Sequence, residues 1–241
     1  MVEVSTSILS VKKGEESQTF FALEKAHTDY FHIDVMDGKF VEKNTVDKMN
    51  KYSNILKQIT TLPLDVHLMV EDVETYVKLY SAIEPNMITF HLEAIKDKEK
   101  IYEMIKLVKD NNCKVGIAIK PSTEVKEIYE FLPYINTVLV MTVEPGKGGQ
   151  ALIPETLRKV RILKEYLNQH NLDTYIEADG GINLDTIDEV KESGVDIAVV
   201  GNGILKTDKK RNEKASKYIR EKTEPLLFLF ESLPDIARLD I

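Results

Sequence analysis

The segment HIDVMDG at 32–38 has the composition of a β-strand that ends in polar side chains. Because side chains two apart on a strand share one face, His32 and Asp34 should project together. The segment DVHLMV at 65–70 repeats this arrangement, since His67 follows an aspartate by two positions. Two separate strands therefore deliver histidine and carboxylate side chains, which indicates enzyme chemistry rather than a scaffold.

Apolar and β-branched runs recur on both sides of these segments and predict the remaining strands. We expect strands near 2–9, 30–36, 63–69, 87–92, 114–119, 137–143, 174–178 and 197–201. Amphipathic patterns alternate with them and predict helices near 17–27, 45–58, 72–82, 98–111, 123–131, 154–169, 184–193 and 209–232. Capping residues mark several helix ends, namely Asp97, Thr123, Asn183 and Gly194.

Eight strands that alternate with eight helices in 241 residues predict an α/β fold, a (β/α)₈ TIM barrel. A doubly wound sheet more often has five or six strands. No linker interrupts the pattern, so we expect 1–241 to form one domain in which 206–241 supplies a terminal helix and a tail. This last segment is apolar, and we expect it to pack on the first helix or, alternatively, to form a subunit contact in a homo-oligomer.

Composition excludes several other classes of protein. A net charge of −8 argues against a general nucleic-acid surface, so an anionic ligand must be held by local groups. The single cysteine, Cys113, favours a reducing compartment, and we expect a cytoplasmic protein. We find no export leader and no run of about 18 apolar residues, so we expect no membrane association.

The polar strand ends predict a metal site. In a barrel, the carboxyl ends of the strands line the active site, and four polar side chains fall there: His32, Asp34, His67 and Asp179. A lone histidine on a strand is more often packed in the interior, but the joint placement of these four favours a divalent metal. Imidazole and carboxylate ligands admit zinc first, with iron, manganese and cobalt as alternatives.

Glycine clusters after the last three strands predict a phosphate-binding site. They are Gly146, Gly148 and Gly149 in VEPGKGGQ at 143–150, then Gly180 and Gly181, then Gly201 beside Asn202. Glycines let backbone N–H groups approach an anion closely, and barrels commonly bind phosphate at these loops. Lys147 can assist or simply be solvated.

Other residues near the strand ends allow two interpretations. His91 and Glu93 are again two apart, and we expect them to lie behind the ligands or in the wall of the site rather than to act as extra metal ligands. Met36, Met69 and Met141 either fill the core or form an apolar ceiling over an anionic intermediate.

These segments together resemble the ribulose-phosphate 3-epimerase family of metal-dependent (β/α)₈ barrels in the pentose phosphate pathway. The resemblance runs in family order through SILS at 7–10, HIDVMDG, DVHLMV, MTVEPGKGGQ and DGGI to the glycines at 201–203. It implies that His32, Asp34, His67 and Asp179 bind the metal, and that Asp34 and Asp179 also serve as acid and base. It further implies that Ser7 contacts the substrate and that the phosphate is surrounded by Gly146 to Gly149, Gly180, Gly181, Gly201 and Asn202.

The implied reaction moves a proton at C3 of a phosphorylated ketose. One aspartate removes the C3 proton of D-ribulose 5-phosphate, and the other reprotonates the enediolate from the opposite face to give D-xylulose 5-phosphate. A metal on the substrate oxygens would stabilise the negative charge. No nicotinamide, flavin or pyridoxal cofactor is required.

Some positions depart from the usual family pattern and leave the substrate open. They are Val11 to Lys13, Lys39 to Asn44 and Asn202. A closely similar subgroup epimerises a hexulose 6-phosphate such as D-allulose 6-phosphate. A different phosphate-binding barrel, indole-forming or decarboxylating, needs no histidine-rich metal site. A non-catalytic sugar-phosphate sensor is the alternative from another class, and it needs no opposed aspartates.

Overall fold

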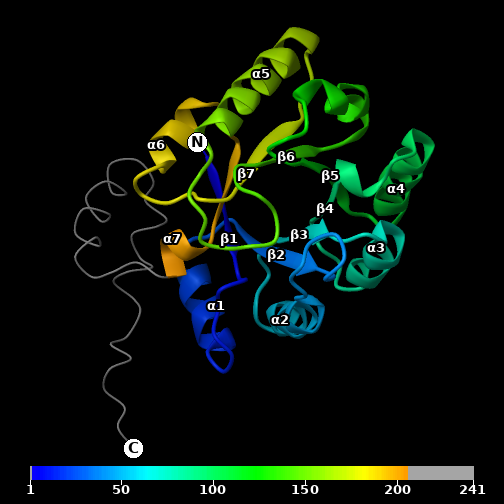
Figure 1. Ribbon diagram of the computed structural model, residues 1–241. Helices are drawn as coiled ribbons and strands as arrows, with labels where there is room; N and C mark the ends of the chain where they lie inside the picture. Colours follow the sequence, from blue (N-terminus) through cyan, green and yellow to red (C-terminus); the bar gives the residue numbers. More distant parts are fainter. Residues whose placement is uncertain (1, 206–241) are drawn as a thin grey trace, which may run out of the picture.

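The computed structural model describes residues 2–205 and shows eight parallel strands closed into a barrel in chain order (Figure 1). The strands are β1 (Glu3–Ser7), β2 (Tyr30–Met36), β3 (Leu64–Met69), β4 (Met87–His91), β5 (Lys114–Ile119), β6 (Thr137–Met141), β7 (Tyr175–Asp179) and β8 (Ile197–Val200). Pairing of β1 with β8 closes the sheet. The predicted (β/α)₈ barrel is confirmed.

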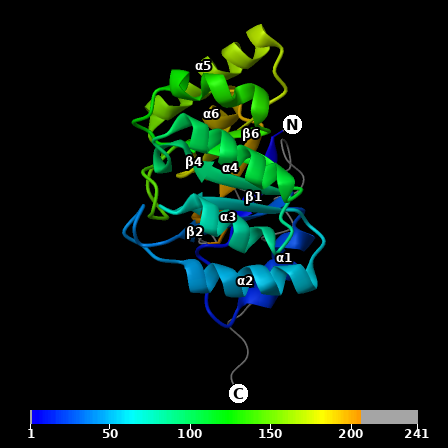
Figure 2. The ribbon, with the colours of Figure 1, turned by 90° about the vertical axis from the view of Figure 1, so that its right-hand side faces the viewer.

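Helices connect successive strands and cover the outside of the barrel (Figure 2). They are α1 (Glu16–Lys25), α2 (Val46–Ile59), α3 (Val73–Ser81), η1 (Leu92–Ala94), α4 (Lys98–Asp110), η2 (Val125–Tyr134), α5 (Pro154–His170), α6 (Ile187–Glu192) and α7 (Asn202–Leu205). The predicted helix at 209–232, like the whole segment 206–241, lies outside the described residues.

Two helices begin two or more residues later than predicted. The connection from β5 to β6 is a 3₁₀-helix that contains Pro133 and is capped by Glu124 through a capping box, so the predicted cap at Thr123 is wrong. The Thr123 hydroxyl instead donates to Glu93. Helix α6 begins three residues later than predicted, because the Asn183 side chain accepts from the Asp185 amide in a turn before the helix.

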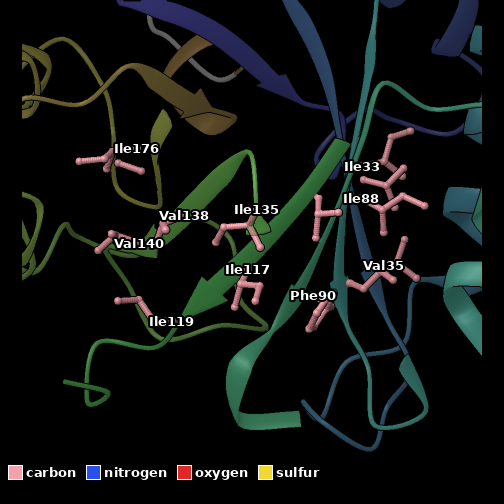
Figure 3. Packing of buried hydrophobic residues seen from close by; sticks show 14 of the residues in the cluster. Ile33, Val35, Ile88, Phe90, Ile117, Ile119, Ile135, Val138, Val140 and Ile176 are labelled. Carbon is pink, nitrogen blue, oxygen red and sulfur yellow. The ribbon is translucent and has the colours of Figure 1, made fainter. Parts of the chain in front are cut away.

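The strands bury both faces, but the two faces differ in chemistry. On β2 and β4 the side chains that point outward are apolar, as Figure 3 shows for Ile33, Val35, Ile88 and Phe90. On β2 these alternate with His32 and Asp34, which are buried inside the barrel. The alternation of side chains along the strand therefore places apolar packing residues on the outer face and polar site residues on the inner face.

Within the part of the chain that the structure describes, none of the helices has both the length and the apolar character needed to cross a membrane.

Candidate active site

Strand register brings the predicted metal ligands to one level of the barrel. Asp34 of β2 pairs with His67 of β3, and His32 lies two residues earlier on the same strand, opposite Asp65. On the other side of the barrel, Asp179 ends β7 beside Met141 of β6. Because all strands are parallel, these side chains converge near the carboxyl end, where barrel active sites lie.

Four ligand atoms form a compact group that fits one cation. One nitrogen or oxygen from each of His32, Asp34, His67 and Asp179 lies within 4.8 Å of the other three. The nitrogen-to-oxygen distances are 3.5 Å for His32 Nε2 to Asp34 Oδ1, 3.9 Å for His32 Nε2 to Asp179 Oδ2, 3.7 Å for His67 Nδ1 to Asp34 Oδ1 and 3.6 Å for His67 Nδ1 to Asp179 Oδ2. Ligands of one tetrahedral zinc lie about 3.3 Å apart.

Two imidazole nitrogens that face this centre, His32 Nε2 and His67 Nδ1, are buried and have no hydrogen-bond partner among residues 2–205. Buried polar atoms are nearly always satisfied, so two orphaned nitrogens aimed at the same two carboxylates indicate an absent ligand. The residues present therefore fit a divalent metal ion.

Neighbouring side chains hold the ligands in place. The second nitrogen of His32, Nδ1, lies 2.6 Å from Asp65 Oδ2, which also accepts from the Ser5 hydroxyl at 2.8 Å. The Ser7 hydroxyl donates to Asp34 Oδ2 at 2.6 Å, so that the other oxygen of Asp34 faces the histidines. Such outer hydrogen bonds orient ligands and fix the histidine tautomer.

His67 is held through a second histidine. Its Nε2 lies 3.0 Å from Nε2 of His91, and Nδ1 of His91 lies 3.0 Å from Glu93 Oε2. Burial lowers the pKa of His91 to about 4, and the neighbouring His67 acts in the same direction. Burial alone would raise the pKa of Glu93, but hydrogen bonding to His91 outweighs it and lowers that pKa to about 2.

The charged neighbours also shift the groups at the centre. Burial favours a neutral Asp34, but His32 and His67 outweigh it and hold its pKa well below the usual range. Burial likewise disfavours a charged His32, yet Asp65 and Asp34 raise its pKa well above the usual value. The centre is thus an array of mutually stabilised charges.

Glu177 is a buried carboxyl below the centre that the sequence analysis missed. It is fully buried two residues before Asp179 on β7, and its Oε1 lies 3.7 Å from His32 Nδ1. Burial and the neighbouring Asp65 raise its pKa well above the usual value. The signal was present in EADGGI, because the two-residue spacing that marks Asp34 also places Glu177 and Asp179 on one face.

A cavity of about 310 Å³ opens above the centre. Its walls include most of the predicted site residues: Ser7, Asp34, Met36, Met69, Met141, Gly146, Lys147, Gly148, Gly149, Asp179, Gly180, Gly181, Gly201 and Asn202. His32 and His67 lie beneath it, fully buried. The lining also includes residues that were not predicted, among them Leu9, Ser10 and Gln150.

Close packing joins the glycine loops after β6, β7 and β8. Gly181 has a φ of 69°, and a Cβ there would lie 2.3 Å from the Leu152 amide nitrogen. A Cβ on Gly149, whose φ is 81°, would lie 2.8 Å from Nδ2 of Asn202. The positive φ favours glycine at both positions, and the two contacts show that three loops meet at one end of the cavity.

Comparison with known proteins agrees with this geometry. The model of the ribulose-phosphate 3 epimerase family matches residues 3–205. The chain belongs to the ribulose-phosphate 3-epimerase family. A curated ribulose-phosphate 3-epimerase from Methanocaldococcus jannaschii is 37% identical over 92% of this chain and 91% of that protein. One from Escherichia coli K12 is 34% identical over 84% of this chain and 88% of that protein.

Solved structures of low identity share the fold of this epimerase-family chain. A 3-hexulose-6-phosphate synthase superposes with a TM-score of 0.66 at 13% identity, covering 95% of this chain and 97% of that one. The KGPDC structure from Streptococcus mutans gives a TM-score of 0.65 at 11% identity, covering 96% of each chain.

The ribulose-phosphate 3-epimerase family is metal-dependent, and the cluster of His and Asp side chains in this chain is a possible metal site.

Proposed function

We propose that this chain epimerises D-ribulose 5-phosphate at C3 to give D-xylulose 5-phosphate. The observation that carries the proposal is the convergence of His32, Asp34, His67 and Asp179 below a cavity whose far end is built from glycine loops. Membership of the epimerase family supports the same reaction.

Two aspartates at the floor of the cavity are proposed as acid and base. Both Asp34 and Asp179 line the cavity, and Asp179 keeps 15% of its side chain exposed. Epimerisation needs one group to remove the C3 proton and another to return a proton from the opposite face. Ser7 holds one oxygen of Asp34 and so fixes the orientation of that carboxylate.

The same four residues would hold the metal through His32 Nε2, His67 Nδ1 and one oxygen each of Asp34 and Asp179. A divalent cation, zinc first among the candidates, supplies positive charge that stabilises negative charge on the substrate oxygens.

The remaining cavity walls are assigned to binding. Backbone N–H groups of Gly146 to Gly149, Gly180, Gly181 and Gly201 would hold the phosphate, with Asn202 and Lys147 beside them. Met36, Met69 and Met141 are buried and give the cavity an apolar wall that limits the access of water.

A hexulose 6-phosphate such as D-allulose 6-phosphate is the second candidate substrate. The segment 39–44 departs from the family pattern, and its Val41 lies against Gly146 at the edge of the cavity.

We also propose that the protein is cytoplasmic and that it forms a homo-oligomer.

The test is direct turnover of both phosphorylated sugars by the zinc-loaded protein. We expect a kcat/KM for D-ribulose 5-phosphate at least tenfold above that for D-allulose 6-phosphate. The reverse order would transfer the assignment to the hexulose phosphate, and turnover of neither sugar would refute the proposed reaction.

A further inference from the structure

The hydrogen bonds behind His67 have a direction that follows from, and rests on, the proposed metal site. Nδ1 of His67 faces Asp34 and Asp179, and within the described part of the chain this nitrogen has no hydrogen-bond partner. A histidine binds a metal through an unprotonated nitrogen. If Nδ1 is the ligand atom, the ring proton of His67 must be on Nε2.

This placement of the proton determines the state of His91. Nε2 of His67 can then only donate across the 3.0 Å contact, so Nε2 of His91 must be the acceptor. The proton of a neutral His91 is therefore on Nδ1, which lies 3.0 Å from Glu93 Oε2. The three side chains form a hydrogen-bonded chain in which every donor points away from the metal.

Glu93 is held so that it can only accept. Its other oxygen, Oε1, receives the Lys120 amide at 2.7 Å and the Thr123 hydroxyl. Two donors on one oxygen and His91 on the other satisfy an ionised carboxylate. The β5–η2 connection thereby fixes the direction of the hydrogen bonds from His67 through His91 to Glu93.

Packing leaves the two rings little freedom to turn. His67 and His91 are fully buried, and their ring centroids lie 5.0 Å apart. The Phe40 ring covers His91 at a centroid distance of 4.9 Å. His32, by contrast, meets its carboxylate, Asp65, directly at 2.6 Å. The two histidine ligands are thus oriented by different arrangements.

We propose that Glu93 and His91 are positioning residues that hold His67 in the Nε2-protonated tautomer and so keep its Nδ1 available to the metal. Reversal of the hydrogen bonds that link these three side chains would place a proton on His67 Nδ1 and oppose metal binding.

Glu93→Gln tests the proposal with little change in volume. Its single carbonyl oxygen cannot accept from both the β5–η2 connection and His91, and its amide group donates where Glu93 only accepts. We expect zinc affinity, measured by competition with a chromophoric chelator, to fall about 10- to 100-fold.

Glu130→Gln is the matched control. Glu130 lies in the same surface groove as Glu93 and pairs with Lys98. Its replacement by glutamine removes the same negative charge at a nearby position and leaves the bond between His91 and Glu93 in place. We expect its zinc affinity to stay within about twofold of the wild-type value. Thermal unfolding of each metal-free variant verifies that the protein under test is folded.

The second measurement is the histidine ¹⁵N spectrum of the full chain, which reports the tautomer of His91. We expect a proton on Nδ1 and none on Nε2 in the wild type, and loss of this single tautomer in Glu93→Gln. A wild-type His91 protonated on Nε2, or unchanged zinc affinity in folded Glu93→Gln, would overturn the proposal. A zinc-binding protein without epimerase activity would instead refute the proposed function, since the affinity difference would persist.

Discussion

At the residue scale, two side chains of the site use one polar atom to bond a neighbouring residue and direct the other toward the centre. Asp34 accepts from Ser7 with one oxygen and faces the histidines with the other. His32 meets Asp65 with one nitrogen and leaves the second for the centre. In Asp34 and in His32, the atom that faces the centre is therefore oriented by a hydrogen bond at the other polar atom of the same side chain.

Asp179→Asn should remove nearly all epimerisation while leaving the fold intact. The amide preserves the shape of the side chain but cannot take or return a proton, so we expect kcat to fall at least about 10³-fold. A coupled assay of xylulose 5-phosphate formation measures the loss. Asp110→Asn, at an exposed ion pair with Lys106, is the control and should keep full activity. Near-normal turnover by Asp179→Asn would refute its proton-transfer role.

Ser7→Ala should lower kcat about tenfold or more, because a hydrogen bond to a charged group contributes about 1.5 to 3 kcal/mol. Steady-state kinetics at saturating substrate measures the effect. Ser53→Ala serves as control, since Ser53 is a buried serine whose hydroxyl has no hydrogen-bond partner in the residues that the structure describes. Equal kcat values for the two variants would show that the Ser7–Asp34 bond does not orient the reacting carboxylate.

At the element scale, the register of parallel strands converts a period-two pattern into a site. The alternation in 32–38 and 65–70 was sufficient to predict that His32, Asp34 and His67 would share one side of the sheet. The direction of the hydrogen bonds behind them was not predictable, because Glu93 is bound by a connection that follows a different strand. The local sequence pattern predicts which side chains share a face of the sheet, whereas their hydrogen-bond partners become known only from the tertiary structure.

Gly181→Ala should weaken binding of the phosphorylated substrate. Its Cβ would collide with the Leu152 amide, so the β6–α5 loop must move, and we expect KM to rise at least about tenfold. Gly14→Ala is the matched control, because Gly14 also has a positive φ but a Cβ there would meet no atom of the described residues within 4 Å. It should cost about 1 to 2 kcal/mol of stability and leave KM unchanged. A similar KM for both variants would argue against a phosphate site in these loops.

At the scale of the whole molecule, the centre joins strands that are far apart in the chain. Its four side chains come from β2, β3 and β7, so a bound metal would link these three strands within the barrel. The alternation of strands and helices predicted this closed architecture from sequence alone. The segment 206–241 lies outside the described residues, and its proposed role in assembly stays a prediction.

Metal binding should therefore stabilise the folded protein. Zinc at about 100 times its dissociation constant adds about 2.7 kcal/mol, which corresponds to a rise in Tm of about 5 to 10 °C. Differential scanning calorimetry with and without a chelator measures the shift. His67→Ala should show a much smaller shift and lower metal content, whereas His170→Ala, at an exposed helix end, should behave as wild type. Unchanged metal content in His67→Ala would count against its ligand role.

The most direct test of the account is hydrogen exchange at C3 of D-ribulose 5-phosphate in deuterated water. Proton removal by one aspartate and return by another predicts that the xylulose 5-phosphate formed carries solvent deuterium at C3, with none at C4 or C5. Xylulose 5-phosphate that retains the original C3 hydrogen would contradict the central claim that Asp34 and Asp179 transfer protons at this carbon.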